Sequence, residues 1–223
     1  MSEPTGVKTT PGSKMILTMG LVASICGVLI VAAFENTQGP IAENKRIMVE
    51  RAVLKVLPGA AKVREYVATP SGIKPLEGVV VEGGVKFYAA YDAAGALKGI
   101  AVEAAGKGYA DVVRVLYGYD VSCQCIIGIG VVSMRETPGI GDKIITDQEF
   151  LKNFEALDVR VNSELTALAN AVKVVKHGSK QNAWEIDAIA GATVTSKAVG
   201  RGINESAQKL MPLLAPHITE LKP

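Results

Sequence analysis

The pattern of apolar and polar residues divides the chain into three parts. The first contains residues 15–34 (MILTMGLVASICGVLIVAAF), which carry no charged side chain over twenty positions. A helix of that length rises about 1.5 Å per residue and spans the hydrocarbon layer of a bilayer. Residues 1–14, which precede it, are rich in Pro, Gly, Thr and Ser, a composition typical of disorder. We therefore predict a disordered arm at residues 1–14 and one transmembrane helix at residues 15–34.

A cleaved signal peptide is the alternative interpretation of this apolar segment. The apolar stretch of a signal peptide is usually shorter, and the residues before Ala32 and Ala33 form a poor cleavage pattern. Basic residues lie on both sides of the segment, so their number does not determine its orientation. The nearest charges, Lys14 before it and Glu35 after it, favour a cytoplasmic N-terminus. We favour a retained anchor in that orientation.

The second part, residues 35–60, is predicted to be a helical connector. Between Ile41 and Leu57 the apolar residues recur at helical spacing, at Ile47, Val49, Val53, Leu54 and Leu57. The pair Pro58-Gly59 then favours the end of the helix.

The third part, residues 61–215, has the pattern of an antiparallel sheet with flanking helices. Short runs rich in Val, Ile and Tyr occupy residues 78–82, 85–92, 97–104, 112–120 and 125–133. Gly83-Gly84 and Ala94-Gly95 stand between runs, where hairpin turns are expected. Since no helical pattern separates these runs, they predict an antiparallel meander.

From residue 147 onward the pattern becomes partly helical. Residues 147–157 (DQEFLKNFEAL) predict a short helix capped by Thr146 or Asp147, and a Val-rich piece follows at residues 172–175. A last helix is predicted from Thr195 to Leu214, where apolar residues recur every three or four positions. Residues 216–223 form a C-terminal tail. The predicted fold class is therefore α+β behind one transmembrane helix.

Composition and charge exclude several classes of function. The formal net charge is +2, and no basic run is longer than Lys45-Arg46, so the clustered basic face of a nucleic-acid-binding protein is not expected. Three cysteines are too few for a disulfide framework, and we interpret Cys123 and Cys125 as buried thiols on one face of a strand. The two histidines have no other good ligand nearby in the sequence, which argues against a histidine-based metal site.

Local structure alone explains residues 187–195 (DAIAGATVT) poorly. Gly191 permits a tight turn, and Thr193 and Thr195 fall at the predicted start of the last helix. Free N–H groups and the positive end of the helix dipole favour a phosphate at such a position. The alternative is an ordinary helix start that is capped by a threonine.

Residues 135–143 (RETPGIGDK) form a second unusual segment. It contains two glycines, a proline and four charged residues directly after an apolar strand. A solvated loop is one interpretation, but the segment is long for a hairpin connection, which makes it a candidate binding loop.

These two segments resemble motifs of the FMN-binding domain family. DAIAGAT matches the family motif Asp-x-x-(Ser/Thr/Ala)-Gly-Ala-Thr, whose last threonine is joined to the FMN phosphate by a flavin transferase that takes FMN from FAD. That position is Thr193. RETPGIGDKI resembles a loop of the G subunit of the Rnf electron-transport complex and of the related C subunit of the sodium-translocating NADH:quinone reductase. Residues 106–120 resemble the family's glycine-tyrosine segment, in which a glycine often replaces Asp111.

The resemblance implies a covalently bound FMN, as a phosphoester of Thr193, and a set of residues around it. These cofactor-binding candidates are Asp187, Gly191, Ala192, Thr195, Glu136, Thr137, Gly139 and Ile140. Aromatic residues make up 5% of the chain, so we expect aliphatic and glycine contacts with the ring.

The resemblance also implies location and partners. The flavin domain is expected outside the cytoplasm, on the periplasmic side of the inner membrane in Gram-negative cells. There the FMN is expected to exchange electrons with a second flavin-bearing membrane protein of the Rnf complex. The predicted function is electron transfer within an ion-translocating ferredoxin:NAD oxidoreductase.

Three alternatives to this function differ in what they require. The first is the C subunit of the sodium-translocating NADH:quinone reductase. The second is a membrane-anchored assembly module without a cofactor. The third is a free-standing flavin reductase, against which the lack of a convergent acid and base set in the sequence argues.

Overall fold

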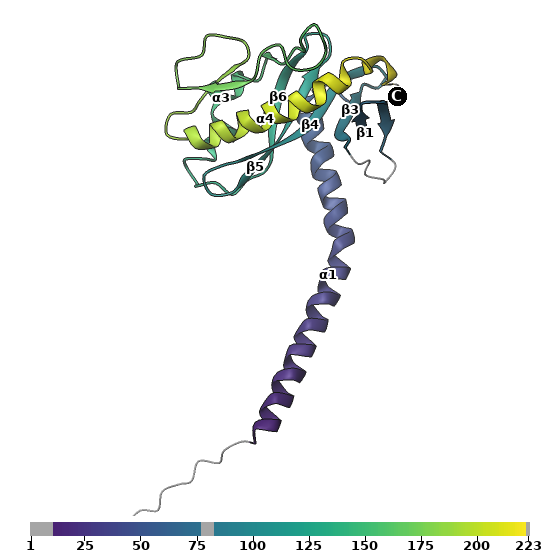
Figure 1. Cartoon of the computed structure of the whole chain (residues 1–223), viewed down its shortest axis with the longest axis vertical. Coiled ribbons are helices and arrows are strands. Elements are labelled where there is room, and N and C mark those ends of the chain that lie inside the picture. The colour runs from purple at the N-terminus through teal and green to yellow at the C-terminus, as the bar shows by residue number, and fades with distance from the viewer. Residues whose placement is uncertain (1–10, 77–82, 222–223) are drawn as a thin grey trace, which may run out of the picture. The chain divides into compact units, whose positions relative to one another are not determined.

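The computed structural model describes residues 11–76 and 83–221 and divides into two compact units, Met1–Ile47 and Met48–Pro223. The first unit consists of the N-terminal part of helix α1 (Gly12–Val56), and the second contains the sheet and the other helices (Figure 1). Most of the predicted disordered arm and the predicted strand at residues 78–82 lie outside the described residues.

Helix α1 is one continuous element. The sequence pattern suggested an anchor followed by a separate helix, but the structure joins the two and includes Pro40 in the helix. A proline inside a helix removes one N–H donor and crowds the carbonyl four residues earlier, at Asn36, which disfavours a straight helix, yet α1 continues past Pro40. The helix is long and apolar enough to cross a membrane, and its apolar stretch is exposed.

The second unit is built on a seven-stranded antiparallel sheet. Its strand order is β2-β1-β3-β4-β5-β6-β7. The strands are β1 (Lys62–Thr69), β2 (Gly72–Pro75), β3 (Val85–Tyr91), β4 (Leu97–Lys107), β5 (Val112–Asp120), β6 (Cys125–Ser133) and β7 (Leu157–Asp158). The predicted meander is confirmed for β3 to β6, and β1, β2 and β7 extend it at both edges.

The turn between β3 and β4 forms where Ala94-Gly95 predicted it. Gly95 has a φ of 86°, in the left-handed region that glycine adopts without steric cost. The Asp92 carboxylate accepts hydrogen bonds from the N–H groups of Ala94 and Ala96, both at 2.9 Å.

Both faces of the sheet are covered, because successive side chains of a strand point to opposite sides. One face packs against helix α4 (Thr193–Leu214), which lies across the sheet in Figure 1. This core includes Phe87, Tyr91, Ile100, Val102, Val115 and Tyr117 of the sheet, and Val199, Ile203 and Leu210 of α4. The opposite face packs against the end of α1, with Tyr88, Ala101 and Leu116 meeting Val49, Val53 and Val56.

The segment between β6 and α4 contains short elements. These are α2 (Lys143–Thr146), α3 (Gln148–Lys152), and the strands β8 (Lys173–Val175) and β9 (Glu185–Asp187). Asp147 is the N-cap of α3, since its carboxylate accepts from the N–H of Phe150 at 2.9 Å. Strands β8 and β9 pair in parallel as a separate two-stranded sheet, and β8 falls within the predicted Val-rich piece. Helix α4 begins at Thr193, two residues earlier than predicted, and a 3-10 turn (Ile218–Glu220) follows it.

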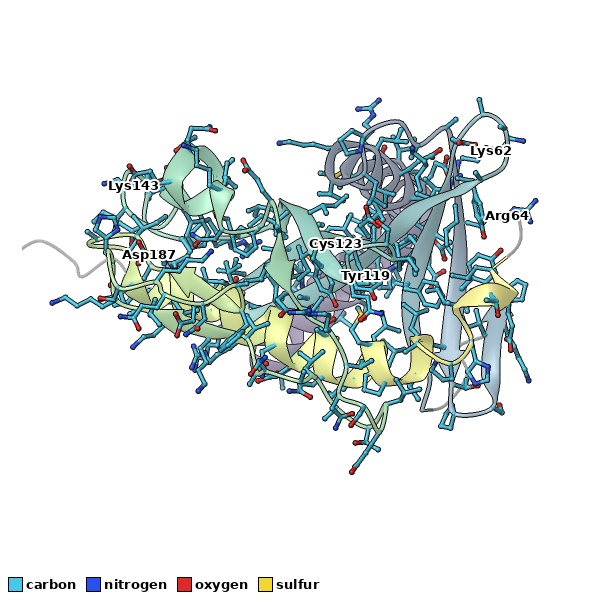
Figure 2. All side chains as sticks on the ribbon, turned by 90° about the horizontal axis from the view of Figure 1, so that it is seen from above. Lys62, Arg64, Tyr119, Cys123, Lys143 and Asp187 are labelled. Carbon is cyan, nitrogen blue, oxygen red and sulfur yellow. A yellow bond between two sulfur atoms is a disulfide. The ribbon has the colours of Figure 1, made fainter. Side chains whose placement is uncertain are left out.

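Cys123 and Cys125 form a disulfide, so the prediction of two buried thiols is wrong. Cys123 lies in the turn that follows β5, and Cys125 begins β6. The chain reverses at Gln124, and the two Cα atoms are 5.2 Å apart, closer than the roughly 6.7 Å between residues i and i+2 of a strand. The turn therefore brings the two sulfur atoms together (Figure 2).

Candidate functional site

The candidate site lies where three segments meet beside the N-terminus of α4. They are the turn 108–111 between β4 and β5, the loop 134–142 after β6, and residues 191–195. Together they enclose a pocket of about 460 Å³, a size common among small-molecule sites. The pocket is lined by Tyr109, Glu136, Thr137, Ile140, Gly141, Gly191, Ala192, Thr193, Val194 and Thr195.

Most of the residues predicted from the sequence line this pocket. The structure brings together Glu136, Thr137, Ile140, Gly191, Ala192, Thr193 and Thr195. Gly139 and Asp187 do not line it. Three lining residues were not singled out by the sequence: Tyr109, Gly141 and Val194. Tyr109 belongs to the glycine-tyrosine segment at residues 106–120, and the resemblance of that segment to the family is the sequence feature that could have identified Tyr109 as a site residue.

Glu136 connects the three segments through hydrogen bonds. Its Oε2 accepts from Thr195 Oγ1 at 2.7 Å and from the Tyr109 N–H at 3.3 Å. Its Oε1 accepts from the N–H groups of Ala110 and Asp111 at 3.1 and 3.4 Å. Burial disfavours the charged carboxylate, but the hydrogen bonds outweigh burial and lower the pKa of Glu136 below its ordinary value. Glu136 is therefore a charged clamp that holds the wall of the pocket together.

Two glycines allow the chain to approach this clamp closely. A Cβ added at Gly141 would lie 2.6 Å from Glu136 Cβ and 3.1 Å from Thr195 Oγ1. A Cβ at Gly108 would lie 2.5 Å from Glu136 Oε1. Any larger side chain at either position would push the clamp apart.

Gly139 shapes the loop although it does not line the pocket. Its φ of 77° is in the left-handed region, and it lies inside a turn in which Ile140 and Gly141 donate their N–H groups to the Thr137 carbonyl, at 3.2 and 2.9 Å. This turn presents Ile140 to the pocket.

Among the residues that the structure describes, no side chain caps the N-terminus of α4. The N-cap residue is Ala192, so the alternative of a threonine-capped helix start is wrong. Within residues 11–76 and 83–221, no hydrogen bond engages the N–H groups of Thr193, Val194 or Thr195. Unengaged N–H groups at the positive end of a helix favour an anion such as a phosphate.

The two threonines of this helix start differ in what their hydroxyls do. Thr195 is 3% exposed, and its hydroxyl donates to Glu136. Thr193 is exposed, lines the pocket and makes no side-chain hydrogen bond in the described part of the chain. The Thr193 hydroxyl is therefore available to form a bond with another group.

The mouth of the pocket exposes large apolar side chains. Tyr109, Ile140 and Val194 are 76%, 49% and 47% exposed. Exposed apolar side chains gathered at one place are typical of a binding surface. They suit a flat aromatic ring, with Tyr109 as an aromatic contact that adds to the expected aliphatic ones. Since none of the described residues that line the pocket is a lysine or arginine, a phosphate there would depend on the N–H groups of α4.

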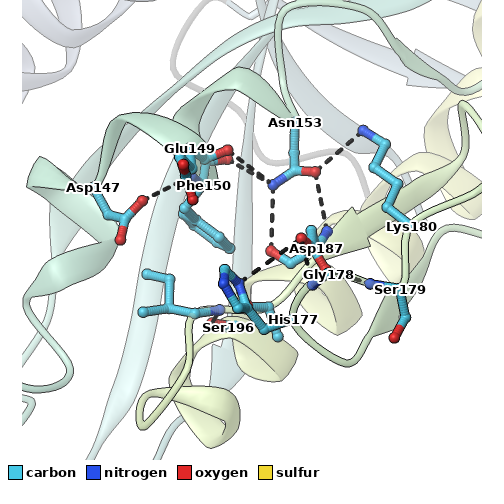
Figure 3. Close-up of polar contacts among 12 residues, drawn as sticks. Asp147, Glu149, Phe150, Asn153, His177, Gly178, Ser179, Lys180, Asp187 and Ser196 are labelled. Carbon is cyan, nitrogen blue, oxygen red and sulfur yellow. Dashed lines mark hydrogen bonds and ion pairs between the residues drawn. The ribbon is translucent and has the colours of Figure 1, made fainter.

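Asp187 organises the chain that leads to α4 rather than the pocket itself. Its carboxylate accepts from the N–H groups of Gly178 at 2.8 Å and Ser179 at 3.4 Å. Asn153 holds its backbone, because Oδ1 accepts from the Asp187 N–H at 3.0 Å and Nδ2 donates to the Asp187 carbonyl at 3.3 Å. Figure 3 shows these contacts around β9. Asp187 therefore positions the segment that carries Gly191 and Thr193.

The Glu136 clamp makes a pH-dependent contribution to stability. Its pKa is lower in the folded chain than the ordinary 4.5, so the contribution is present above pH 4.5 and is lost as the pH falls through the lowered value. Glu136→Gln keeps the shape but removes the charge. We expect it to lower the free energy of unfolding at neutral pH by about 1 kcal/mol and to flatten the acid part of the pH profile.

Urea unfolding of the full-length protein in detergent, followed from acidic to neutral pH, measures both effects. The matched control is Glu155→Gln, because Glu155 is exposed and its side chain makes no hydrogen bond within the described residues. Identical pH profiles for the wild type and Glu136→Gln would contradict the assignment of a charged clamp.

Comparisons with known proteins agree with this geometry. Residues 108–208 match the FMN-binding domain family. The chain is 27% identical over 191 residues to the G subunit of an ion-translocating oxidoreductase complex of Methanosarcina acetivorans, covering 84% of this chain and 88% of the relative. It is 28% identical over 186 residues to the G subunit of a proton-translocating ferredoxin:NAD(+) oxidoreductase complex of Clostridium ljungdahlii, covering 83% and 84%.

A solved structure shares the fold. The crystal structure of Shewanella oneidensis NqrC superposes with a TM-score of 0.61 at 19% sequence identity. The superposition covers 78% of this chain and 98% of that protein.

Proposed function

We propose that this chain is the electron-transfer component of a membrane-bound ferredoxin:NAD oxidoreductase of the Rnf type. Its match to the FMN-binding domain family and its similarity to the G subunits of ion-translocating oxidoreductase complexes support this proposal. Its FMN is joined through the phosphate to Thr193. One observation carries the proposal: an exposed, unengaged threonine hydroxyl stands at an uncapped helix N-terminus on the wall of a pocket of about 460 Å³.

The residues of the site have distinct parts in holding this group. Thr193 Oγ1 would hold the group as a phosphoester: a flavin transferase would exchange the pyrophosphate bond of FAD for the bond between Thr193 Oγ1 and the FMN phosphorus, with AMP and the hydroxyl proton released. The N–H groups at the start of α4 would stabilise the phosphate charge. Glu136 and Thr195 hold the pocket wall in place.

The bound FMN supplies the redox chemistry. A phosphoester does not modify the isoalloxazine ring, so the surrounding backbone and side chains tune it. Ile140, Val194 and Tyr109 would offer apolar contacts for the ring.

The flavin domain is proposed to lie outside the cytoplasm, with α1 as the membrane anchor and the N-terminus inside. The Cys123–Cys125 disulfide supports this side, because disulfides persist in oxidising compartments and are rare in the cytosol. A covalent bond to FMN also suits this location, since it prevents loss of the cofactor where free FMN is scarce.

The partners in this proposal are the other proteins of the complex, including a second flavin-bearing membrane protein. The sequence relatives, which are named as G subunits, favour this assignment over the C subunit of the sodium-translocating quinone reductase. The likeness to NqrC, at 19% identity, concerns the fold alone.

The test is the mass and colour of the full-length protein made together with a flavin transferase. We expect an added mass equal to FMN minus one water, located on the peptide that contains Thr193. The protein should stay yellow after acid precipitation and should be bleached reversibly by a chemical reductant.

Two other results would favour the alternatives. A colourless protein of unmodified mass under the same conditions would support a cofactor-free assembly module. Steady turnover of a soluble donor and acceptor pair by the isolated protein would support a free-standing flavin reductase.

A further inference from the structure

The Cys123–Cys125 disulfide lies far from the candidate site. The pocket is next to the start of β5 at Val112, whereas the disulfide follows the end of β5 at Asp120. Eight steps of about 3.3 Å along the strand separate Val112 from Asp120 by roughly 26 Å. In Figure 2, Cys123 is likewise well apart from Lys143, which directly follows the loop 134–142 beside the pocket. The disulfide therefore has no direct part in holding the flavin.

Stabilisation of the fold is not the main effect of this disulfide. It encloses a single residue, Gln124, and the entropic stabilisation from a cross-link grows with the length of the loop it closes. Strands β5 and β6 are already paired up to Asp120 and Cys125 by the sheet itself. Removing the cross-link would thus free very little additional chain.

The residue inside the ring has an unfavourable backbone conformation. Gln124 has a φ of 52°, in the left-handed region that a non-glycine residue occupies at a cost. Opening the ring removes the covalent constraint that holds this conformation. Disulfides that are strained or exposed are the more easily reduced ones.

The two cysteine residues differ in their exposure. Cys123 is exposed, whereas Cys125 is 7% exposed and begins strand β6. The nearby Asp120 carboxylate is occupied by the N–H and hydroxyl of Ser122, at 2.7 and 2.6 Å. Cys123 is therefore the cysteine of the pair that is more open to a thiolate from solvent.

We propose that the Cys123–Cys125 pair is a thiol–disulfide exchange site whose partner is an extracytoplasmic protein with two neighbouring thiols. A partner thiolate attacks Cys123 Sγ, the bond between the two sulfurs breaks, and Cys125 leaves as a thiolate. The partner's second thiolate then attacks the partner sulfur that is bonded to Cys123 Sγ, and Cys123 leaves as a thiolate. The pair gains two electrons, and the partner's dithiol becomes a disulfide. This exchange does not depend on the flavin.

The test uses dithiothreitol as the dithiol probe. The full-length Cys26→Ala variant leaves the pair as the reactive cysteines, because Cys26 is an exposed free cysteine. We expect brief treatment of the native protein to expose both thiols to a maleimide polymer that shifts them on a gel, with the near-UV circular dichroism unchanged. Labelling before dithiothreitol, or labelling that requires a denaturant, would overturn the proposal.

A pair of variants at Gln124 tests the reason for the reactivity. Glycine adopts a positive φ without cost, so Gln124→Gly should be reduced several-fold more slowly than the parent. Gln124→Ala keeps the unfavourable conformation and should react at the parental rate. A glycine variant that reacts as fast as the parent would overturn the account of a strained, exchangeable ring.

Discussion

Thr193→Ala is expected to abolish covalent flavin attachment, whereas Thr195→Ser should retain it. Without the Thr193 hydroxyl no phosphoester can form, and the neighbouring Thr195 cannot replace it because it is buried and donates its proton to Glu136. Thr195→Ser is the matched control, since serine keeps the hydroxyl donor for the clamp. The fluorescent band of the flavinylated protein on a denaturing gel measures the outcome.

A third variant distinguishes the loss of the attachment reaction from a loss of folding. Thr193→Ser keeps a hydroxyl on the same backbone atom and should retain part of the label. Circular dichroism should show the same fold in all three variants, because the Thr193 side chain is exposed and makes no hydrogen bond in the described chain, and because serine at position 195 keeps the donor to Glu136. Retention of the label in Thr193→Ala would contradict the assignment and move the attachment to another hydroxyl, such as that of Thr195.

Gly106→Ala is expected to destabilise the domain by about 3 kcal/mol. Helix α4 rests directly on β4 at this position, and an added Cβ would overlap the carbonyl group of Ala198. Both partners are backbone, so neither can move aside as a flexible side chain would. The helix must shift away from the sheet, and because its first turn carries Thr193, flavin attachment should also decrease.

Gly130→Ala is the control for this substitution. The nearest atom to a Cβ there is Val56 Cγ1 at 3.4 Å, which is an ordinary contact, so the change in unfolding free energy should remain within about 1 kcal/mol. Urea unfolding of the full-length proteins in detergent measures both variants. Equal stability of Gly106→Ala and Gly130→Ala would show that α4 does not rest on β4 as described.

The elements that the sequence predicted well are those whose pattern is local. Strands β3 to β6 carry long runs of β-branched and aromatic residues between glycine turns, and the last helix has a regular apolar stripe. Asp147 was a correct cap candidate because capping involves a residue three positions away. Strand β1 was not recognised, since charged residues such as Lys62 and Arg64 interrupt its pattern. Its identity as a strand comes from its pairing with β3.

The disulfide shows the limit of reasoning from spacing. Two cysteines separated by one residue point to the same face of a strand and cannot bond in that geometry. The bond forms because β5 ends at Asp120 and the chain turns through Gln124 before β6 begins. That strand end is decided by how β5 and β6 pair.

For the candidate site, the sequence by itself determined the residue types: a Gly-Ala-Thr motif before a helix, a glycine-rich loop and an apolar segment long enough to cross a membrane. Only the tertiary structure decided their roles. Glu136 and Thr195 are 59 positions apart, and their hydrogen bond buries one threonine hydroxyl while the other stays exposed. Composition and spacing act along the chain, whereas the availability of a hydroxyl depends on which distant groups the fold places beside it.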